Sequence, residues 1–174
     1  MSSLDRKARA IALLGTAIFL FVAPGTVAGF LPWWIGRWHV HASFFGLVAL
    51  RAVGGLLLAA GFVLLIEAFL RFALEGIGTP APIYPAKHLV VTGSYQYVRN
   101  PMYIAVVSLI FGQGLIFGDF RILVYGLFVW AGSHVFVVMY EEPALRRSFP
   151  VEYAVYCEHV SRWIPRLKPW RERI

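Results

Sequence analysis

Long stretches without charge constrain this chain more than any other feature of its sequence. No charged residue lies between Arg9 and Arg37, and 59% of the 174 residues are hydrophobic whereas only 14% are charged. About 20 consecutive apolar residues suffice to cross a bilayer, and charges are rare in such segments because burying them in hydrocarbon is costly. The chain therefore has the composition of an integral membrane protein, and its length fits one domain.

Four apolar segments predict the membrane-spanning helices, at residues 11–31, 48–70, 102–117 and 122–140. The third segment would rise only about 24 Å at 1.5 Å per residue, so we expect it to begin below the membrane surface. Only four residues, 118–121, separate the third segment from the fourth, and Gly118-Asp119 among them leaves room only for a tight turn. The predicted fold is an all-α integral membrane protein with about four transmembrane helices, the last two forming a tight antiparallel hairpin.

A short cytosolic helix is predicted to follow these spans, because Pro150 suits the first position of a helix and Val151, Ala154 and Val155 recur at helical spacing. Pro24-Gly25 predicts a kink in the first span. Between the second and third spans, the glycines and prolines of residues 75–97 exclude a regular helix.

Basic residues predict the orientation. With the N-terminus inside, only Arg37, Arg51 and Arg121 of the sixteen Lys and Arg residues would lie on the outer side. Cytosolic loops carry an excess of such residues, so both termini are expected in the cytosol. The net charge of +7 then indicates anionic lipid headgroups as a partner rather than nucleic acid.

Two polar groups would meet at the cytosolic ends of the last two spans. Arg99, which can hold a carboxylate or phosphate, precedes Asn100-Pro101 at the start of the third span, where helix N–H groups are free to bind an anion. Glu141-Glu142 closes the fourth span, where the helix dipole disfavours carboxylates. We therefore expect a compensating cation, either Arg146 or a cationic ligand. An arginine facing a glutamate suits a zwitterionic amino-acid group.

Other polar residues are less decisive. Glu67 either reaches the membrane surface or faces a polar cavity. His134 is expected to bond to a neighbouring group rather than to a ligand. The single cysteine, Cys157, cannot form an internal disulfide, and the sequence holds no HExxH, CxxC or GxGxxG pattern. We predict no metal site and no Rossmann fold.

The polar groups belong to a longer ordered pattern. It comprises residues 76–82 (GIGTPAP), 89–95 (LVVTGSY), 97–103 (YVRNPMY) and 140–143 (YEEP), followed by Arg162-Trp163-Ile164-Pro165. This pattern resembles the isoprenylcysteine carboxyl methyltransferases, which are membrane-embedded enzymes. The NPMY and EEP elements also resemble phosphatidylethanolamine N-methyltransferases. The resemblance covers about residues 75–165 and indicates a bacterial-type member.

The resemblance implies that S-adenosyl-L-methionine is the cofactor and that the last two spans and the C-terminal segment hold it. Glu141 would bind its ammonium end. The other implied cofactor-binding residues are Lys87, His88, Leu89, Val90, Tyr95, Asn100, Pro101, Met102 and Tyr103. Arg99 and Glu142 are the catalytic candidates, either at the reacting end or as support for it. Residues 1–74 would form a two-helix membrane region, and residues 75–174 a methyltransferase core with cofactor loop, hairpin and cap.

The sequence therefore predicts a methyltransferase that acts on a lipidic or small hydrophobic acceptor by in-line displacement, in a bacterial inner membrane. The acceptor group would be a carboxylate, an amine or a thiol. Two alternatives stay open: an NADPH-dependent reductase of the sterol type, and a non-enzymatic scaffold or small transporter. Cofactor binding distinguishes the three hypotheses.

Overall fold

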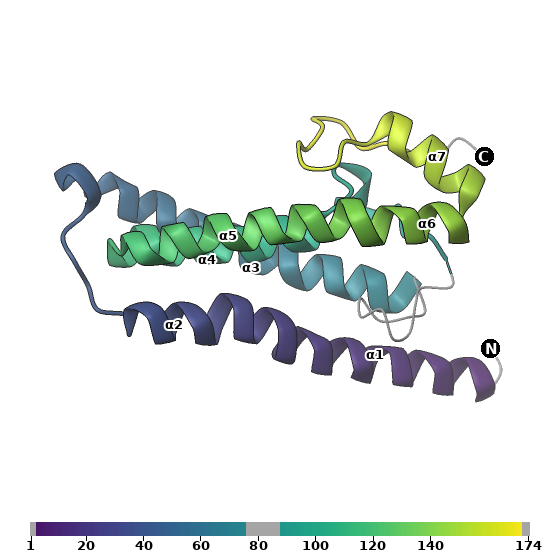
Figure 1. Cartoon of the computed structure of the whole chain (residues 1–174). Helices are drawn as coiled ribbons and strands as arrows, with labels where there is room; N and C mark the ends of the chain where they lie inside the picture. The colour runs from purple at the N-terminus through teal and green to yellow at the C-terminus, as the bar shows by residue number, and fades with distance from the viewer. Residues whose placement is uncertain (1–2, 76–87, 172–174) are drawn as a thin grey trace.

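The computed structural model describes residues 3–75 and 88–171, with side chains from residue 14 onward, and these residues form helices and connecting loops without a β-strand. The helices lie side by side along one long axis (Figure 1). The longer elements are α1 (Ser3–Pro24), α2 (Leu31–Gly36), α3 (Ala49–Glu75), α4 (Pro101–Phe117), α5 (Phe120–Phe136), α6 (Glu142–Ser148) and α7 (Pro150–His159). Two π-helical turns, η1 (Gly25–Phe30) and η4 (Val137–Glu141), and two 3-10 turns, η2 (Phe44–Gly46) and η3 (Gly93–Gln96), complete the described helical structure.

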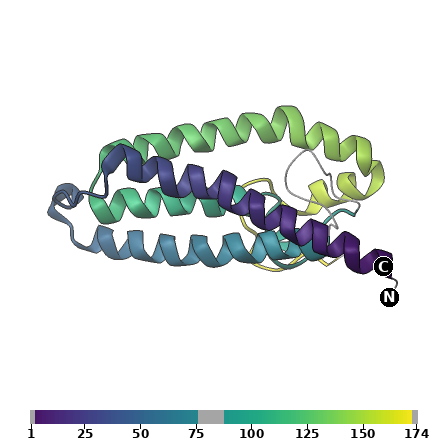
Figure 2. The same cartoon turned by 90° about the horizontal axis from the view of Figure 1, so that it is seen from below.

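Three continuous helical rods are apolar and long enough to cross a bilayer: Leu14–Gly36, Ala49–Glu75 and Phe120–Ser148. The shorter apolar helix α4 lies between α3 and α5, and α1 crosses over this layer (Figures 1 and 2). The predicted all-α membrane fold is confirmed, and so is the hairpin of the last two spans. Gly118 turns the hairpin in the left-handed region (φ 65°), and the Asp119 side chain accepts a hydrogen bond from the backbone N–H of Arg121.

The bundle has two distinct ends. The "turn end" carries the α4–α5 turn and residues 37–48, which connect α2 to α3. The "site end" carries the N-terminus, the start of α4 and the C-terminal segment (Figure 1). The predicted polar residues of both spans therefore lie at the same end of the bundle.

The π-helical turn η1 begins at Gly25, where the sequence predicted a kink, and side chains of neighbouring helices bond to it. Backbone carbonyl groups at membrane depth need such partners. The buried amide of Gln113 donates from Nε2 to the Ala28 carbonyl oxygen at 2.7 Å, and Tyr125 donates its hydroxyl to the Val27 oxygen at 2.9 Å. Gln113 also accepts a hydrogen bond from the Trp38 indole at 3.2 Å. One polar side chain thus joins α4 to the first rod.

The Gln113→Leu variant should lower the free energy of unfolding by about 1–2 kcal/mol, because side-chain hydrogen bonds inside membrane proteins each contribute about 0.6 kcal/mol and up to about 1.7. Unfolding of purified protein in mixed micelles, followed by circular dichroism, measures this change. The matched control is Phe128→Leu on the exposed face of α5, where we expect a change within about 0.5 kcal/mol. Equal effects of the two substitutions would contradict this role of Gln113.

Close backbone contact between α3 and α4 depends on two glycines. A Cβ atom added to Gly54 would lie 2.8 Å from the Gly112 carbonyl oxygen, and one added to Gly112 would lie 2.8 Å from the Gly54 oxygen. The neighbouring Gly55 has no atom within 4 Å of such a Cβ. Gly54 is therefore required for the helix contact, whereas Gly55 has space for a larger side chain.

Gly54→Ala should destabilise the protein by about 1–3 kcal/mol, because overpacking against backbone forces the helices apart. Gly55→Ala is the matched control on the same helix and should be neutral or slightly stabilising, since alanine is the better helix former. Thermal unfolding of the two variants in the same detergent compares them. A more stable Gly54→Ala variant would show that the contact is not tight.

Candidate functional site

A strap of residues 88–100, which includes the turn η3, crosses the site end between α3 and α7. Before η3 its neighbouring side chains Leu89 and Val90 contact two different layers. Val90 packs with Tyr95 against Ala68 of α3, and Met102 borders this cluster. Leu89 packs on the opposite side, against a buried cluster of Tyr153, Tyr156 and Val160. The strap is therefore part of the core, although it has little regular structure.

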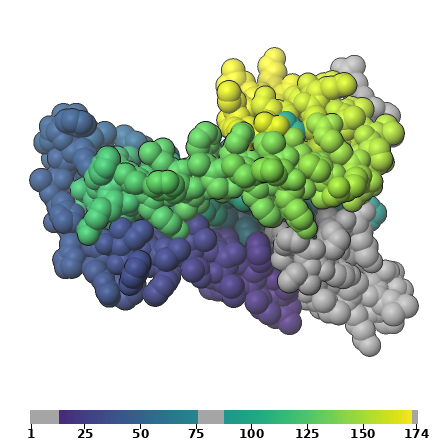
Figure 3. Space-filling model, viewed as in Figure 1, coloured from purple at the N-terminus to yellow at the C-terminus, as the bar shows by residue number. Residues whose placement is uncertain are grey.

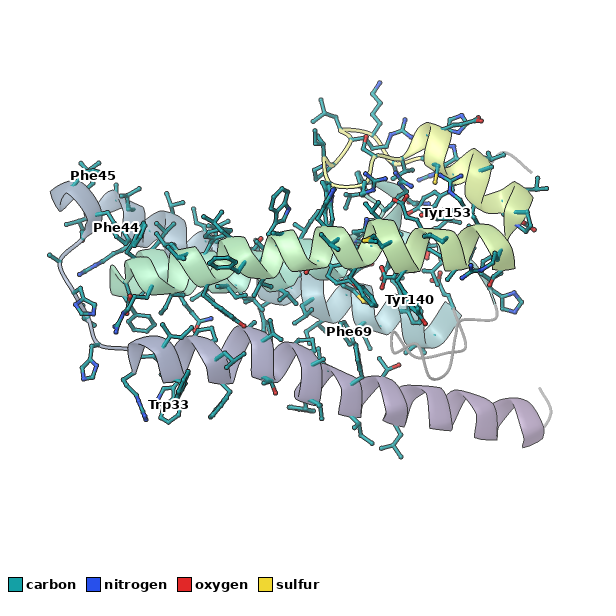
Figure 4. The ribbon with its side chains drawn as sticks, viewed as in Figure 1. Trp33, Phe44, Phe45, Phe69, Tyr140 and Tyr153 are labelled. Atoms are coloured by element: carbon teal, nitrogen blue, oxygen red, sulfur yellow. The ribbon has the colours of Figure 1, made fainter. Side chains whose placement is uncertain are left out.

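Hydrogen bonds attach the strap to the C-terminal segment. The Tyr156 hydroxyl donates to the carbonyl oxygen of Tyr95 at 2.6 Å. Backbone N–H groups of Arg166 and Trp170 donate to the strap carbonyls of Tyr97 and Gln96, each at 3.0 Å. Figure 4 shows Tyr153 directed from α7 toward the bundle. The C-terminal segment thus closes over the strap.

Glu67 holds the other side of the strap. Its carboxylate pairs with Arg71 at 3.0 Å and accepts a 3.4 Å hydrogen bond from the backbone N–H of Ser94. Gly93 has a φ of 56°, and a Cβ atom there would lie 2.1 Å from Glu67 Oε1. Glu67 therefore contacts both Arg71 and the strap; that it faces a polar cavity stays a prediction. Burial raises the pKa of Tyr95 well above its usual range, and nearby Tyr156, Glu141 and Glu67 act in the same direction, so its phenol stays neutral.

Glu142 is buried and held by two arginines. Arg162 binds it with two parallel hydrogen bonds, from Nε to Oε1 at 2.6 Å and from Nη2 to Oε2 at 3.0 Å. Arg99 Nη1 lies 3.3 Å from Oε1. The same Arg99 nitrogen contacts Cys157 Sγ at 2.6 Å and the Tyr153 hydroxyl at 3.4 Å. This ion pair joins the end of the fourth span to the strap and to the C-terminal segment.

The prediction that the fourth helix ends at Glu141-Glu142 is wrong. The chain passes through η4 and continues as α6 to Ser148, so neither carboxylate lies at a helix C-terminus. The dipole therefore does not explain their need for a cation. The direct ion pairs of Glu142 are with Arg162 and Arg99, whereas Arg146 lies over the Tyr153 ring, 5.7 Å from its centre.

Glu141 has a different environment from its neighbour. Tyr103 donates its hydroxyl to Glu141 Oε1 at 2.6 Å. Within the described part of the chain, no arginine, lysine or histidine pairs with this carboxylate. The Glu-Glu pair thus divides into one carboxylate that is bound by two arginines and one that has no basic partner among the described residues.

Trp163 connects the last two spans to the C-terminal segment. Its indole N–H donates to His134 Nδ1 at 2.9 Å, and its ring meets the Tyr103 ring edge-on with centres 6.4 Å apart. The prediction that His134 bonds to a neighbouring group is confirmed. Asn100 donates from Nδ2 to the carbonyl oxygen of Arg162 at 3.1 Å, which fixes the start of α4 to the same segment.

The structure gathers most of the predicted site residues at the site end. Tyr103 meets Glu141, Asn100 and Arg99 meet the segment that binds Glu142, and Pro101 begins α4 as a buried residue. His88 is exposed at the start of the strap. Lys87 lies outside the described residues, as do the glycines and prolines of residues 76–82.

Sequence reasoning missed the roles of Arg162, Trp163 and Tyr153. The partner of Glu142 lies twenty residues away along the chain, beyond a helix and a loop. No local spacing rule joins such residues. The signal available was the place of Arg162-Trp163-Ile164-Pro165 in the family pattern, which does not say what those residues contact.

Comparison with known proteins identifies the family of this chain. A model of the phospholipid methyltransferase family matches residues 49–152, which is more than half of the chain. The chain belongs to the phospholipid methyltransferase family. The resemblance found in the sequence is thereby confirmed. No curated protein matches the chain.

Phospholipid methyltransferases are membrane proteins that use S-adenosylmethionine, and the match covers the helices that build the site. It begins at the first residue of α3 and ends in α7, so it includes Arg99, Glu141 and Glu142. It therefore extends further toward the N-terminus than the resemblance in the sequence and stops before Arg162 and Trp163.

Proposed function

We propose that this protein is an S-adenosylmethionine-dependent methyltransferase that acts on a lipidic or small hydrophobic acceptor. The observation that carries the proposal is that the two carboxylates of the Glu141-Glu142 pair have different binding partners. Arg162 and Arg99 bind Glu142, whereas Glu141 accepts a hydrogen bond from Tyr103 and has no basic partner among the described residues. A lone carboxylate at the membrane surface suits the cationic ammonium end of the cofactor.

The residues around Glu141 fit the rest of the cofactor chemically. Val90 and Tyr95 are buried in one apolar cluster with Met102 packed against it, and an apolar surface of this kind would suit an adenine ring. Asn100, Pro101, Met102 and Tyr103 would bound the site from the start of α4. Lys87, His88, Leu89 and Val90 would contribute mainly backbone groups. When bound, the sulfonium group supplies the methyl group that is transferred.

Arg99 and Glu142 serve best as support for the reacting end. Their ion pair fixes the strap, the fourth span and the C-terminal segment to one another. Methyl transfer needs alignment and exclusion of water more than a strong base. A buried pair that holds three elements in place supplies such alignment.

We orient the site end toward the cytosol of a bacterial inner membrane. Most basic residues then lie on the cytosolic side, as the positive-inside rule expects, and the cofactor is available on the same side. The division into residues 1–74 and 75–174 stays a prediction. Family membership favours the transferase over the reductase and the scaffold. The family also favours a lipid acceptor.

Transfer of a tritiated methyl group tests this function. Proteoliposomes of bacterial lipid are incubated with S-adenosylmethionine that is tritiated in its methyl group, and the solvent-extracted lipid is counted. We expect tritium in the lipid with the wild-type protein and little with Glu141→Gln. Glu158→Gln, a carboxylate exposed on α7, is the matched control and should act as the wild type. Lipid labelling that is equal in all samples, including empty liposomes, would contradict the proposal.

A further inference from the structure

The C-terminal loop, residues 161–170, turns back from α7 and runs along the side of the bundle. Figure 1 shows it returning over α5 toward the middle of the helices, and Figure 3 shows the same segment seated on the site end. The backbone bonds of Arg166 and Trp170 to the strap hold it there. This loop therefore does not project away from the bundle into solvent.

The contact of Trp163 with His134 indicates how far the loop reaches. His134 precedes Glu141 by seven residues, which is about 10 Å along a helix. It belongs to the apolar rod Phe120–Ser148. Because the two side chains are hydrogen-bonded at 2.9 Å, Trp163 lies beside the membrane-spanning part of α5, and it begins the tip of the loop, residues 163–168.

Two large apolar side chains at this tip have no cover from the described protein. Ile164 is 76% exposed and Leu167 is 99% exposed. Basic residues accompany them, namely Arg166, Lys168 and Arg171, and residues 161–171 contain no acidic residue. Apolar tips between basic residues are the composition of segments that lie in a membrane interface.

We propose that the C-terminal loop inserts into the leaflet on the side of the site end, with Ile164 and Leu167 among the acyl chains. Lys168 and Arg171 then meet the phosphates of anionic lipids, which attract basic residues near the membrane surface. The proposal goes beyond the proposed function and does not depend on it. It needs only the membrane-spanning helices beside the loop.

Backbone groups at this depth require partners, and the loop has several. Besides the two backbone bonds to the strap, the Arg162 carbonyl accepts from Asn100. Irregular backbone is tolerated at membrane level where protein satisfies it. The loop also carries Arg162, which binds Glu142. The loop that binds the fourth span through Arg162 would therefore also be held in the lipid.

Quenching of a fluorescent amino acid tests the insertion. Dansylalanine is introduced by codon suppression as Leu167→dansylalanine, and separately in place of Phe128 and of Glu158, which are both exposed. Each protein is reconstituted in phosphatidylcholine vesicles with brominated acyl chains, and acrylamide serves as the aqueous quencher. We expect position 167 to follow position 128, with strong quenching by bromine and weak quenching by acrylamide.

Two quenching results would overturn the proposal. Position 167 following position 158, quenched by acrylamide and not by bromine, would place the tip in water. Quenching by neither agent would mean that protein, such as a second copy of the chain, covers it. Adding phosphatidylglycerol should increase the bromine quenching at position 167, and Lys168→Glu should remove that increase. An equal response with and without the anionic lipid would refute the role of the basic residues.

Discussion

Replacing Glu142 with alanine should lower the free energy of unfolding by about 3–5 kcal/mol, the usual cost of removing one partner from a buried ion pair. The substitution leaves Arg99 and Arg162 beside each other without the carboxylate that neutralises them. It also releases the C-terminal segment from the end of the fourth span. Equilibrium unfolding in mixed micelles, followed by circular dichroism, measures the loss.

Glu158→Ala is the matched control for this change, because that carboxylate is exposed on α7. A surface substitution of this kind should change the free energy of unfolding by no more than about 0.5 kcal/mol. Arg162→Lys should give an intermediate loss, since an ammonium group cannot make two parallel bonds to Glu142. If Glu142→Ala were as stable as Glu158→Ala, the ion pair would not hold the segments together.

Replacing Glu141 with glutamine should weaken the binding of S-adenosylhomocysteine by about 10- to 100-fold, because a hydrogen bond to a charged group contributes about 1.5–3 kcal/mol. The stability of the protein should change little. The amide oxygen of glutamine still accepts the hydrogen bond that Tyr103 donates to Glu141. Equilibrium binding of the tritiated ligand to detergent-purified protein gives both affinities.

Tyr103→Phe separates charge from orientation at the same position. It keeps the Glu141 carboxylate and removes only the hydroxyl that orients it, so the affinity should fall less than in Glu141→Gln. Equal binding by Glu141→Gln and the wild type would show that this carboxylate does not hold the ammonium end.

The spans and the hairpin were predictable from the sequence because hydrophobicity and turn chemistry act locally. A membrane helix needs only a long apolar run, and Gly118 supplies the left-handed turn that a two-residue connection requires. The short C-terminal helix from Pro150 follows the same local logic, but it buries Tyr153 and Tyr156, whereas Val151 of the predicted apolar face is exposed. The family pattern likewise depended on residues close together in sequence.

The inner organisation of the site was not predictable in this way. Charges at the end of an apolar run are typical of a span boundary, yet the helix continues through η4, and Glu142 turns inward toward Arg162. Cys157, for which the sequence excluded only an internal disulfide, contacts Arg99. Such contacts join segments through tertiary packing, which no periodicity of a single sequence records.

The most direct test of the central claim is a calorimetric titration of the wild-type protein, purified in detergent, with S-adenosylhomocysteine and, separately, with NADPH. Saturable binding of S-adenosylhomocysteine, without binding of NADPH, is the predicted result. Folded protein that binds NADPH alone, or neither compound, would contradict the assignment of this site to methyl transfer.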